Sequence, residues 1–164
     1  MATLNDLTRY LDNNAIEYRI MTHVPAYSAH NVAMVTHVPD EEMAKTVLVR
    51  ADHTYWLAVL PAQHVVGERL LKHVLEVHDV HLASEDDLET VFPGCESGAM
   101  PPFGNLFGLP VIVDRAIAMN QEIVFNACSH TESIRMKFWD FERLVRPVVA
   151  DFADPRVAHR TEAS

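Results

Sequence analysis

The spacing of apolar residues along the chain predicts a mixture of short helices and short strands. Residues 4–14 carry leucines three and four positions apart behind Thr3, a pattern typical of a capped amphipathic helix. A short strand is expected over residues 17–21. A second short helix is expected over residues 28–35, starting at Ser28.

A pair of longer strands is expected in the middle of the chain. Lys45 stands where a polar segment changes into a β-branched run. Residues 55–60 are six consecutive apolar residues, too few for a typical helix and rich in aromatics. Asp52 and His53 between the two runs are typical turn residues. The pattern therefore predicts a β-hairpin with Lys45 at its entrance.

The second half of the chain shows helices and strands in irregular order. Helices are expected over residues 65–76, with Val66, Leu70 and Val74 on one face, over residues 85–91 behind Ser84, and over residues 141–145 behind Asp140. Strands are expected over residues 111–113, 123–126 and 134–136. Because the elements do not alternate regularly, the predicted fold class is α+β with a mixed sheet, rather than a doubly wound sheet.

The length of 164 residues suits one domain with a substantial core. We expect that domain over residues 1–152, followed by a polar tail over residues 153–164. The sequence starts without a basic, then apolar, leader, and no stretch approaches the roughly 18 apolar residues of a membrane helix. A cytoplasmic location with no membrane partner is therefore expected. Cys95 and Cys128 could form one disulfide, but in a reducing cytosol we expect two free thiols.

The charge balance restricts the choice of partner. The formal net charge is −10, from 13 basic and 23 acidic residues. Proteins that bind nucleic acid mainly through phosphates are usually basic, so we expect no DNA partner. An RNA partner would require a local basic patch, a small footprint, or a second protein that supplies affinity. The candidates for such a patch are Arg50, Arg69, Lys72, Arg135, Lys137, Arg143 and Arg146.

Residues 93–110 interrupt the regular pattern. They contain four of the nine prolines and four of the five glycines. Glycine permits unusual dihedrals and a close approach of the backbone, whereas proline fixes the backbone and removes a donor. Such a segment predicts a stiff loop whose remaining amides can point at a ligand, or else an ordinary long connection. It is not a phosphate-binding P-loop, because the Gly-Lys-Ser/Thr ending is missing.

Three further positions carry side chains suited to chemistry. Lys45 can orient a carbonyl, an ester or a phosphate, or it can be a solvated lysine at the start of a strand. His130 follows an apolar strand, where loops often carry function, but a structural or solvated role is the alternative. Cys128 lies two residues from His130, yet no third group orients the pair, so thiol catalysis is not expected.

The histidines give no metal site. His23, His30 and His37 recur every seven residues. Pro25 breaks a continuous helix there, and no carboxylate or cysteine completes a ligand set. We therefore expect neither a metal nor another cofactor.

Four short stretches follow one another in a fixed order. They are Ala44-Lys45-Thr46-Val47, then Gly98-Ala99-Met100-Pro101-Pro102-Phe103-Gly104, then Leu109-Pro110-Val111 followed by Asp114, and finally Ser129-His130-Thr131-Glu132-Ser133-Ile134-Arg135-Met136 followed by Asp140-Phe141. In this order and spacing they resemble the YbaK/prolyl-tRNA synthetase-associated editing domain family. The resemblance runs from about residue 3 to residue 152, with no synthetase attached, so the chain is similar to the free-standing members and resembles the alanine-editing branch.

The resemblance implies a mixed sheet surrounded by helices, with a pocket on one side. It implies hydrolysis of the ester that joins a wrong amino acid to the 3′-terminal adenosine of tRNA, with alanyl-tRNA(Pro) or another small aminoacyl-tRNA as the expected substrate. The implied catalytic residues are Lys45, Gly98 and His130, and the implied substrate-binding residues are Thr46, Ala99, Met100, Pro101, Pro102 and Ser129. The expected partners are the aminoacyl-tRNA 3′ end and either prolyl-tRNA synthetase or an elongation factor.

Two points remain open at the level of sequence. Cys128 stands where the family leads us to expect a small, glycine-type residue, which leaves the shape of the His130 turn undefined. The acidic balance also favours an alternative function on the same fold, that of a non-catalytic module that binds a ligand or a synthetase.

Overall fold

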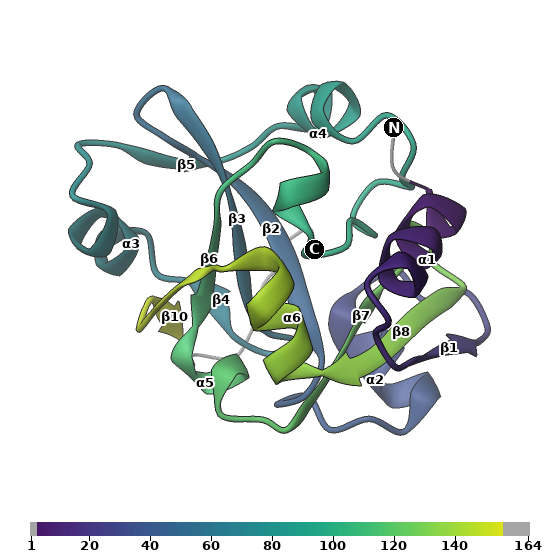
Figure 1. Cartoon of the computed structure of the whole chain (residues 1–164). Helices are drawn as coiled ribbons and strands as arrows, with labels where there is room; N and C mark the ends of the chain where they lie inside the picture. The colour runs from purple at the N-terminus through teal and green to yellow at the C-terminus, as the bar shows by residue number, and fades with distance from the viewer. Residues whose placement is uncertain (1–2, 156–164) are drawn as a thin grey trace.

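The larger of two main sheets has five strands and is mixed. The computed structural model describes residues 3–155, and in it the strands follow the order β5-β2-β3-β6-β9 (Figure 1). β2 is antiparallel to β3 and β5, whereas β3 and β9 both run parallel to β6. The strand bounds are β2 Ala44–Ala51, β3 Thr54–Pro61, β5 Val80–Leu82, β6 Val111–Asp114 and β9 Val148–Ala150.

A second sheet of three antiparallel strands has the order β1-β8-β7. Its strands are β1 (Tyr18–Thr22), β7 (Glu122–Asn126) and β8 (Glu132–Lys137). The two sheets join where Met43 pairs with Val124 in an isolated parallel bridge and the Val124 amide donates to the carbonyl oxygen of Glu42 (2.9 Å). A further antiparallel pair joins β4 (Val65–Val66) to β10 (Ala153–Asp154).

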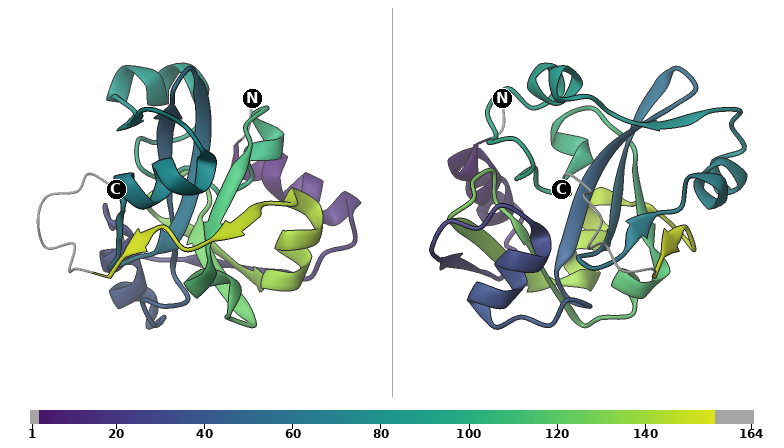
Figure 2. Two further views of the ribbon diagram at one scale, coloured as in Figure 1. Left: turned by 90° about the vertical axis from the view of Figure 1, so that its left-hand side faces the viewer. Right: turned by 180° about the vertical axis from the view of Figure 1, so that it is seen from behind.

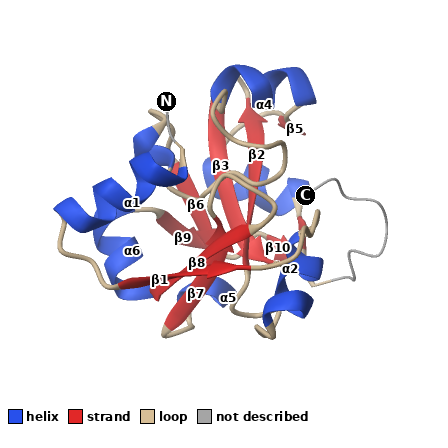
Figure 3. Cartoon of the chain, turned by 90° about the vertical axis from the view of Figure 1, so that its right-hand side faces the viewer, coloured by secondary structure: helices blue, strands red, loops and turns tan. Residues whose placement is uncertain are grey.

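Helices lie around the outside of both sheets (Figures 2 and 3). Together with the mixed sheet, they confirm the α+β prediction. Thr3 caps the first helix in a capping box with Asp6, and Ser28 and Ser84 cap two others as expected. The hairpin of β2 and β3 is also present as predicted. The helices are α1 Leu4–Asn13, α2 Ala29–Thr36, α3 Glu68–Leu75, α4 Glu85–Val91, α5 Arg115–Ala118 and α6 Phe138–Val145, with a 3-10 turn η1 at Gly104–Leu106.

The helix predicted over residues 65–76 is shorter than expected and buries a different face. Gly67 is its N-cap, because Val65–Val66 pair with β10 instead of joining the helix. Leu71 is its buried residue, whereas Leu70 is 46% exposed. The prediction was wrong because the pairing of β4 fixes where the helix starts, and hence which side faces the sheet.

The last helix begins three residues earlier than predicted. α6 starts at Phe138 with Lys137 as its N-cap. Asp140 lies in the first turn and accepts a hydrogen bond from Arg143 (3.3 Å), so it is not the cap. β8 runs directly into this helix, and the buried Phe138 belongs to the main core.

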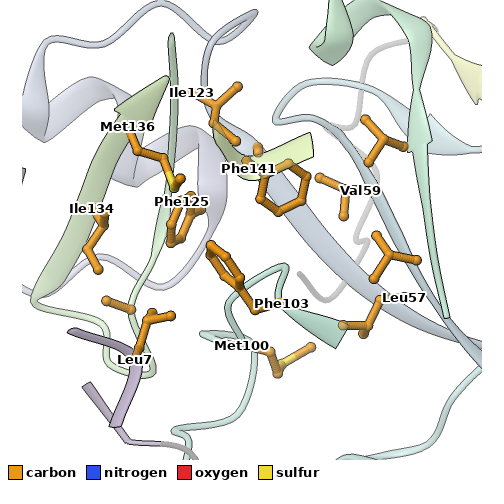
Figure 4. Packing of buried hydrophobic residues seen from close by; sticks show 14 of the residues in the cluster. Leu7, Leu57, Val59, Met100, Phe103, Ile123, Phe125, Ile134, Met136 and Phe141 are labelled. Atoms are coloured by element: carbon orange, nitrogen blue, oxygen red, sulfur yellow. The ribbon is translucent and has the colours of Figure 1, made fainter. Parts of the chain in front are cut away.

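The main core lies between the two sheets and is centred on Phe103 (Figure 4). Its ring lies edge-on to those of Phe125 (5.5 Å between centroids), Phe141 (5.3 Å) and Tyr10 (6.1 Å). Phe103 comes from the Gly/Pro-rich segment. The middle of that segment is therefore anchored in the core, and the segment is not an ordinary surface connection.

Asp114 holds the C-terminal part of the described chain in place through hydrogen bonds. Its carboxylate caps α5 and accepts hydrogen bonds from the amides of Phe152 (2.9 Å) and Ala153 (2.8 Å). Because Ala153–Asp154 forms β10, the fold includes these first residues of the predicted tail. Residues 156–164 of that tail lie outside the described residues. No helix within residues 3–155 has the length and apolar character required to cross a membrane.

Candidate functional site

Lys45 is a buried lysine at the start of β2. Only 3% of the residue is exposed, and its Nζ donates a hydrogen bond to the carbonyl oxygen of His64 (2.7 Å). This excludes the solvated alternative. Burial of an ammonium group is costly unless it is hydrogen-bonded, so the fold holds this charge in a defined place. The turn after β3, which carries His64, provides that support.

The segment that follows α4 is shaped around Gly98. Gly98 has φ +84°, a left-handed conformation that strongly favours glycine. The next four residues, Ala99, Met100, Pro101 and Pro102, are all buried. Within the described part of the chain, no group accepts a hydrogen bond from the amides of Gly98 or Met100. A backbone amide without an acceptor in the protein can donate to a ligand or to water, so these two are candidates for donors to a ligand.

Ala99 ties this segment to the turn after β7. Its amide donates to the Glu96 carbonyl (3.0 Å), and its own carbonyl accepts from the Cys128 amide (2.9 Å). The Glu96 amide donates in turn to the Cys128 carbonyl (3.0 Å). Both backbone groups of Ala99 are therefore used in hydrogen bonds within the protein, and its amide is not a candidate donor to a ligand.

Cys95 and Cys128 form a disulfide at this junction, so the expectation of two free thiols was wrong. The residues are 33 positions apart in sequence, and the backbone hydrogen bonds of the junction bring their Cα atoms to 4.3 Å. Cys128 also has φ +71°. The turn thus has the conformation that suits glycine, which explains why a glycine-type residue was expected there.

His130 lies on the far side of the same turn and is half-buried. Its amide donates to the Glu96 carboxylate (2.9 Å), and its ring contacts that of Tyr27 at 4.9 Å between centroids. Its Nδ1 is buried and has no hydrogen-bond partner among the described residues. Ser129 is different, because its hydroxyl contacts Glu132 Oε1 (3.1 Å) and the Thr131 amide (3.3 Å) and so supports the turn itself.

The start of α2 connects the lysine side of the site to the histidine side. The Ala26 amide donates to the His130 carbonyl (3.0 Å). Three residues beyond Tyr27, His30 Nδ1 lies 2.9 Å from Asp40 Oδ1 and 3.4 Å from Gln63 Nε2. Gln63 immediately precedes His64, the residue that holds Lys45. One short segment therefore contacts both the His130 turn and the turn that supports the lysine.

Asn126 is a candidate that the sequence did not reveal. It is buried at the end of β7, and its Oδ1 has no partner among residues 3–155. It lies two residues beyond Val124, as Lys45 lies two residues beyond Met43, so both share a face at the junction of the sheets. A polar residue ending an apolar strand was the only signal. Thr46 points to the opposite face of β2 from Lys45, so the structure does not bring these two side chains together.

The predicted basic patch forms only in part. Arg135 and Lys137 line a pocket of about 180 Å³ on the three-stranded sheet, together with Arg19. Glu122 lines the same pocket and pairs with Arg135 (3.2 Å), which also pairs with Glu42 (3.3 Å). The positive charge there is largely balanced. Arg50 lies elsewhere, over the Tyr55 ring on the hairpin.

The described residues hold no group of three or more histidine, cysteine or acidic side chains arranged to bind a metal ion. The candidate groups are the buried ammonium of Lys45, the backbone amides of Gly98 and Met100, and the His130 ring beside an exposed aromatic. These groups can orient a polar ligand and stabilise negative charge on an oxygen atom.

Comparison with known proteins identifies the class to which this fold and site belong. Residues 23–144 match the model of the aminoacyl-tRNA editing domain. The chain belongs to this family, and the resemblance seen in the sequence is confirmed. Its place is in translation fidelity, with a relation to prolyl-tRNA synthetases.

Individual relatives agree with this assignment. The chain is 30% identical over 122 residues to a proline–tRNA ligase of Halalkalibacterium halodurans, and 28% identical over 125 residues to one of Lactobacillus acidophilus. These regions cover 74% and 76% of this chain but only 21% of each ligase. The chain therefore spans about a fifth of the length of the curated relatives it matches.

Crystal structures show the same fold. A hypothetical protein superposes with a TM-score of 0.82 at 17% identity, over 90% of this chain and 99% of its own. A protein described as a candidate trans-editing enzyme for prolyl-tRNA synthetase superposes with a TM-score of 0.78 at 14% identity, over 92% of this chain and 96% of its own. At these identities the likeness establishes the fold alone.

Proposed function

We propose that this protein is an aminoacyl-tRNA deacylase that hydrolyses the ester of a mischarged tRNA, with alanyl-tRNA(Pro) as its substrate. The carrying observation is that the Gly98 segment and the His130 turn are tied together in a protein that belongs to the editing family. The buried Lys45 supports the proposal, because it supplies a fixed charge near the junction of the two sheets.

The chemistry requires little more than positioning. An aminoacyl ester is already activated, so holding it next to a water molecule or the neighbouring ribose hydroxyl supplies much of the acceleration. The amides of Gly98 and Met100 are the donors we assign to the oxyanion that develops at the ester carbonyl. One such donor contributes about 3 kcal/mol to transition-state stabilisation. Lys45 orients the carbonyl or the terminal phosphate, and this chemistry needs no metal ion.

Selectivity follows from size. Ala99, Met100, Pro101 and Pro102 are buried, and we assign them to the wall of the pocket that receives the amino acid. Such a wall admits alanine and rejects the larger proline, whereas a synthetase pocket built for proline cannot strongly reject a smaller residue. Editing then acts as a second sieve. We propose that the substrate arrives on prolyl-tRNA synthetase or an elongation factor, because a protein of net charge −10 gains little from phosphate contacts.

The test is a deacylation panel with Ala-tRNA(Pro), Cys-tRNA(Pro), Pro-tRNA(Pro) and other small aminoacyl-tRNAs. We expect Ala-tRNA(Pro) to lose its amino acid well above the spontaneous rate and Pro-tRNA(Pro) to stay intact. Lys45→Ala should abolish turnover and keep the fold, whereas Arg9→Ala on α1, which removes an exposed positive charge, serves as a control. If the protein deacylates none of these aminoacyl-tRNAs faster than the spontaneous rate, the proposed function is refuted.

A binding module is the second candidate, favoured by the acidic balance and by the neutralised pocket around Arg135. It predicts that the protein retains aminoacyl-tRNA or a synthetase without turnover. Retention on immobilised Ala-tRNA(Pro), measured beside the deacylation panel, separates the two functions.

A further inference from the structure

Tyr27 is a large aromatic side chain placed in the open next to the site. It is 69% exposed, yet its ring lies 4.9 Å from that of His130 at an angle of 53°. Single exposed apolar residues are common on protein surfaces and need no explanation by themselves. The contact with His130 is what distinguishes Tyr27, since it leaves most of the tyrosine ring open beside a candidate catalytic group.

The backbone fixes the position of this ring. Before it, the His23 amide donates to the Thr131 carbonyl (2.9 Å) and the Ala26 amide donates to the His130 carbonyl (3.0 Å). After it, Ser28 caps α2 through the Asn31 amide (3.1 Å). Tyr27 is thus held between a strand-like pairing and a helix cap. A ring fixed in this way loses little freedom when a second flat group packs on it.

From this arrangement we infer that Tyr27 is a stacking platform for the adenine of the terminal adenosine, an inference that rests on the proposed deacylase function. The reacting ester is attached to the ribose, and the base is attached to the same sugar. An ester held between the Gly98 segment and His130 therefore places its base within reach of a ring that touches His130. Tyr27 acts here as a positioning residue and takes no part in bond breaking.

The inference also accounts for how an acidic protein can hold the end of an RNA. Stacking on an aromatic ring uses the π-face of the base and needs no neutralisation of phosphates. On the nearby three-stranded sheet, Arg135 is already paired with Glu42 and Glu122. An uncharged platform gives affinity for the one nucleotide that carries the ester.

The test compares Tyr27→Ala, Tyr27→Phe and Tyr27→Trp, with Met34→Ala as a control because Met34 is an exposed apolar residue of α2, the helix that follows Tyr27. With Ala-tRNA(Pro), we expect Tyr27→Ala to raise KM about 5- to 150-fold and to leave kcat within about twofold. Tyr27→Phe, Tyr27→Trp and Met34→Ala should behave like the wild type. An unchanged KM for Tyr27→Ala, or an equal loss for Tyr27→Phe, would overturn the platform.

Two further measurements separate this inference from the proposed function. Alanine methyl ester has no base, so wild type and Tyr27→Ala should hydrolyse it equally, and a large difference would contradict the platform. The amide analogue 3′-alanylamino-3′-deoxyadenosine is not hydrolysed, so its binding reports on the platform without turnover. Loss of that binding in Tyr27→Ala supports the platform even if no tRNA is deacylated, whereas absent or unaffected binding refutes it.

Discussion

Cys95 and Cys128 are joined so that the segment carrying Gly98 and the turn carrying His130 form one unit. Three hydrogen bonds reinforce the same junction, namely two between backbone groups and one from the His130 amide to the Glu96 carboxylate. Two candidate groups from distant parts of the chain therefore cannot move independently while the disulfide is intact. Preorganisation of this kind is what a site based on positioning requires.

Reduction of the disulfide should destabilise the protein. The bond closes a loop between residues 33 positions apart, and its loss should lower the free energy of unfolding by roughly 3 kcal/mol. Reductant has access, because Cys95 lines a cavity of about 390 Å³ beside α4. Urea unfolding with and without reductant measures the effect, and Cys95→Ser serves as the control that reductant should not change. Equal stability of the oxidised and reduced wild type would contradict the expectation.

The backbone at position 128 should prefer glycine once the disulfide is gone. Because φ is +71° there, a side chain costs about 1–2 kcal/mol that glycine avoids. In a Cys95→Ser background, Cys128→Gly should therefore unfold at higher urea than Cys128→Ala. Since both variants lack the disulfide, the comparison isolates the backbone. The reverse order would show that the turn relaxes to another conformation.

A side chain at position 104 should destabilise the protein strongly, whereas a side chain at position 108 should destabilise it only slightly. A Cβ on Gly104 would lie 2.5 Å from the Leu109 carbonyl oxygen and 2.5 Å from Val111 Cγ2. At Gly108 it would meet nothing within 4 Å, and only the φ of +70° opposes it. Gly104→Ala should cost about 1–3 kcal/mol or more by overpacking, and Gly108→Ala about 1 kcal/mol by backbone strain. Thermal unfolding of the two variants should rank them in that order.

Low pH should destabilise the protein near α4, because Asp87 becomes protonated. Hydrogen bonds, first from the Tyr55 hydroxyl (2.6 Å) and then from Ser84, hold the pKa of Asp87 below its ordinary value. A lowered folded pKa gives stability that is present above the unfolded pKa of about 3.9 and is lost as the pH falls through the folded value. Unfolding measured between pH 7 and pH 2 should show this loss. Asp87→Asn should remove part of it.

The same pair should also respond to alkali. The hydrogen bond to Asp87 is the main cause that raises the pKa of Tyr55 above its ordinary value of about 10. A raised folded pKa gives stability that is present below pH 10 and is lost as the pH rises through the folded value. Tyr55→Phe should therefore flatten the alkaline side of the stability profile. A profile identical to that of the wild type would refute the coupling.

Much of the fold was readable from local patterns. The helices α1, α2 and α4 begin behind Thr3, Ser28 and Ser84, because a cap and the spacing of apolar residues are properties of neighbouring positions. The hairpin with Lys45 at its entrance could also be predicted, because two apolar runs joined by turn residues are a property of neighbouring positions. The start of α3 was misread, because the pairing of Val65–Val66 with the distant β10 decides it.

Some features of the candidate site could likewise be predicted from local sequence, whereas others depend on tertiary contacts. The sequence predicted a stiff loop at Gly98 from the backbone preferences of glycine and proline, and a strand beginning at Lys45 from the β-branched run that follows it. Only the tertiary structure decided that Lys45 is buried against His64, that Cys95 meets Cys128, and that Tyr27 covers His130. These contacts join residues 19, 33 and 103 positions apart. Nothing in the local spacing encodes them, because they depend on how two separate sheets pack around a shared core.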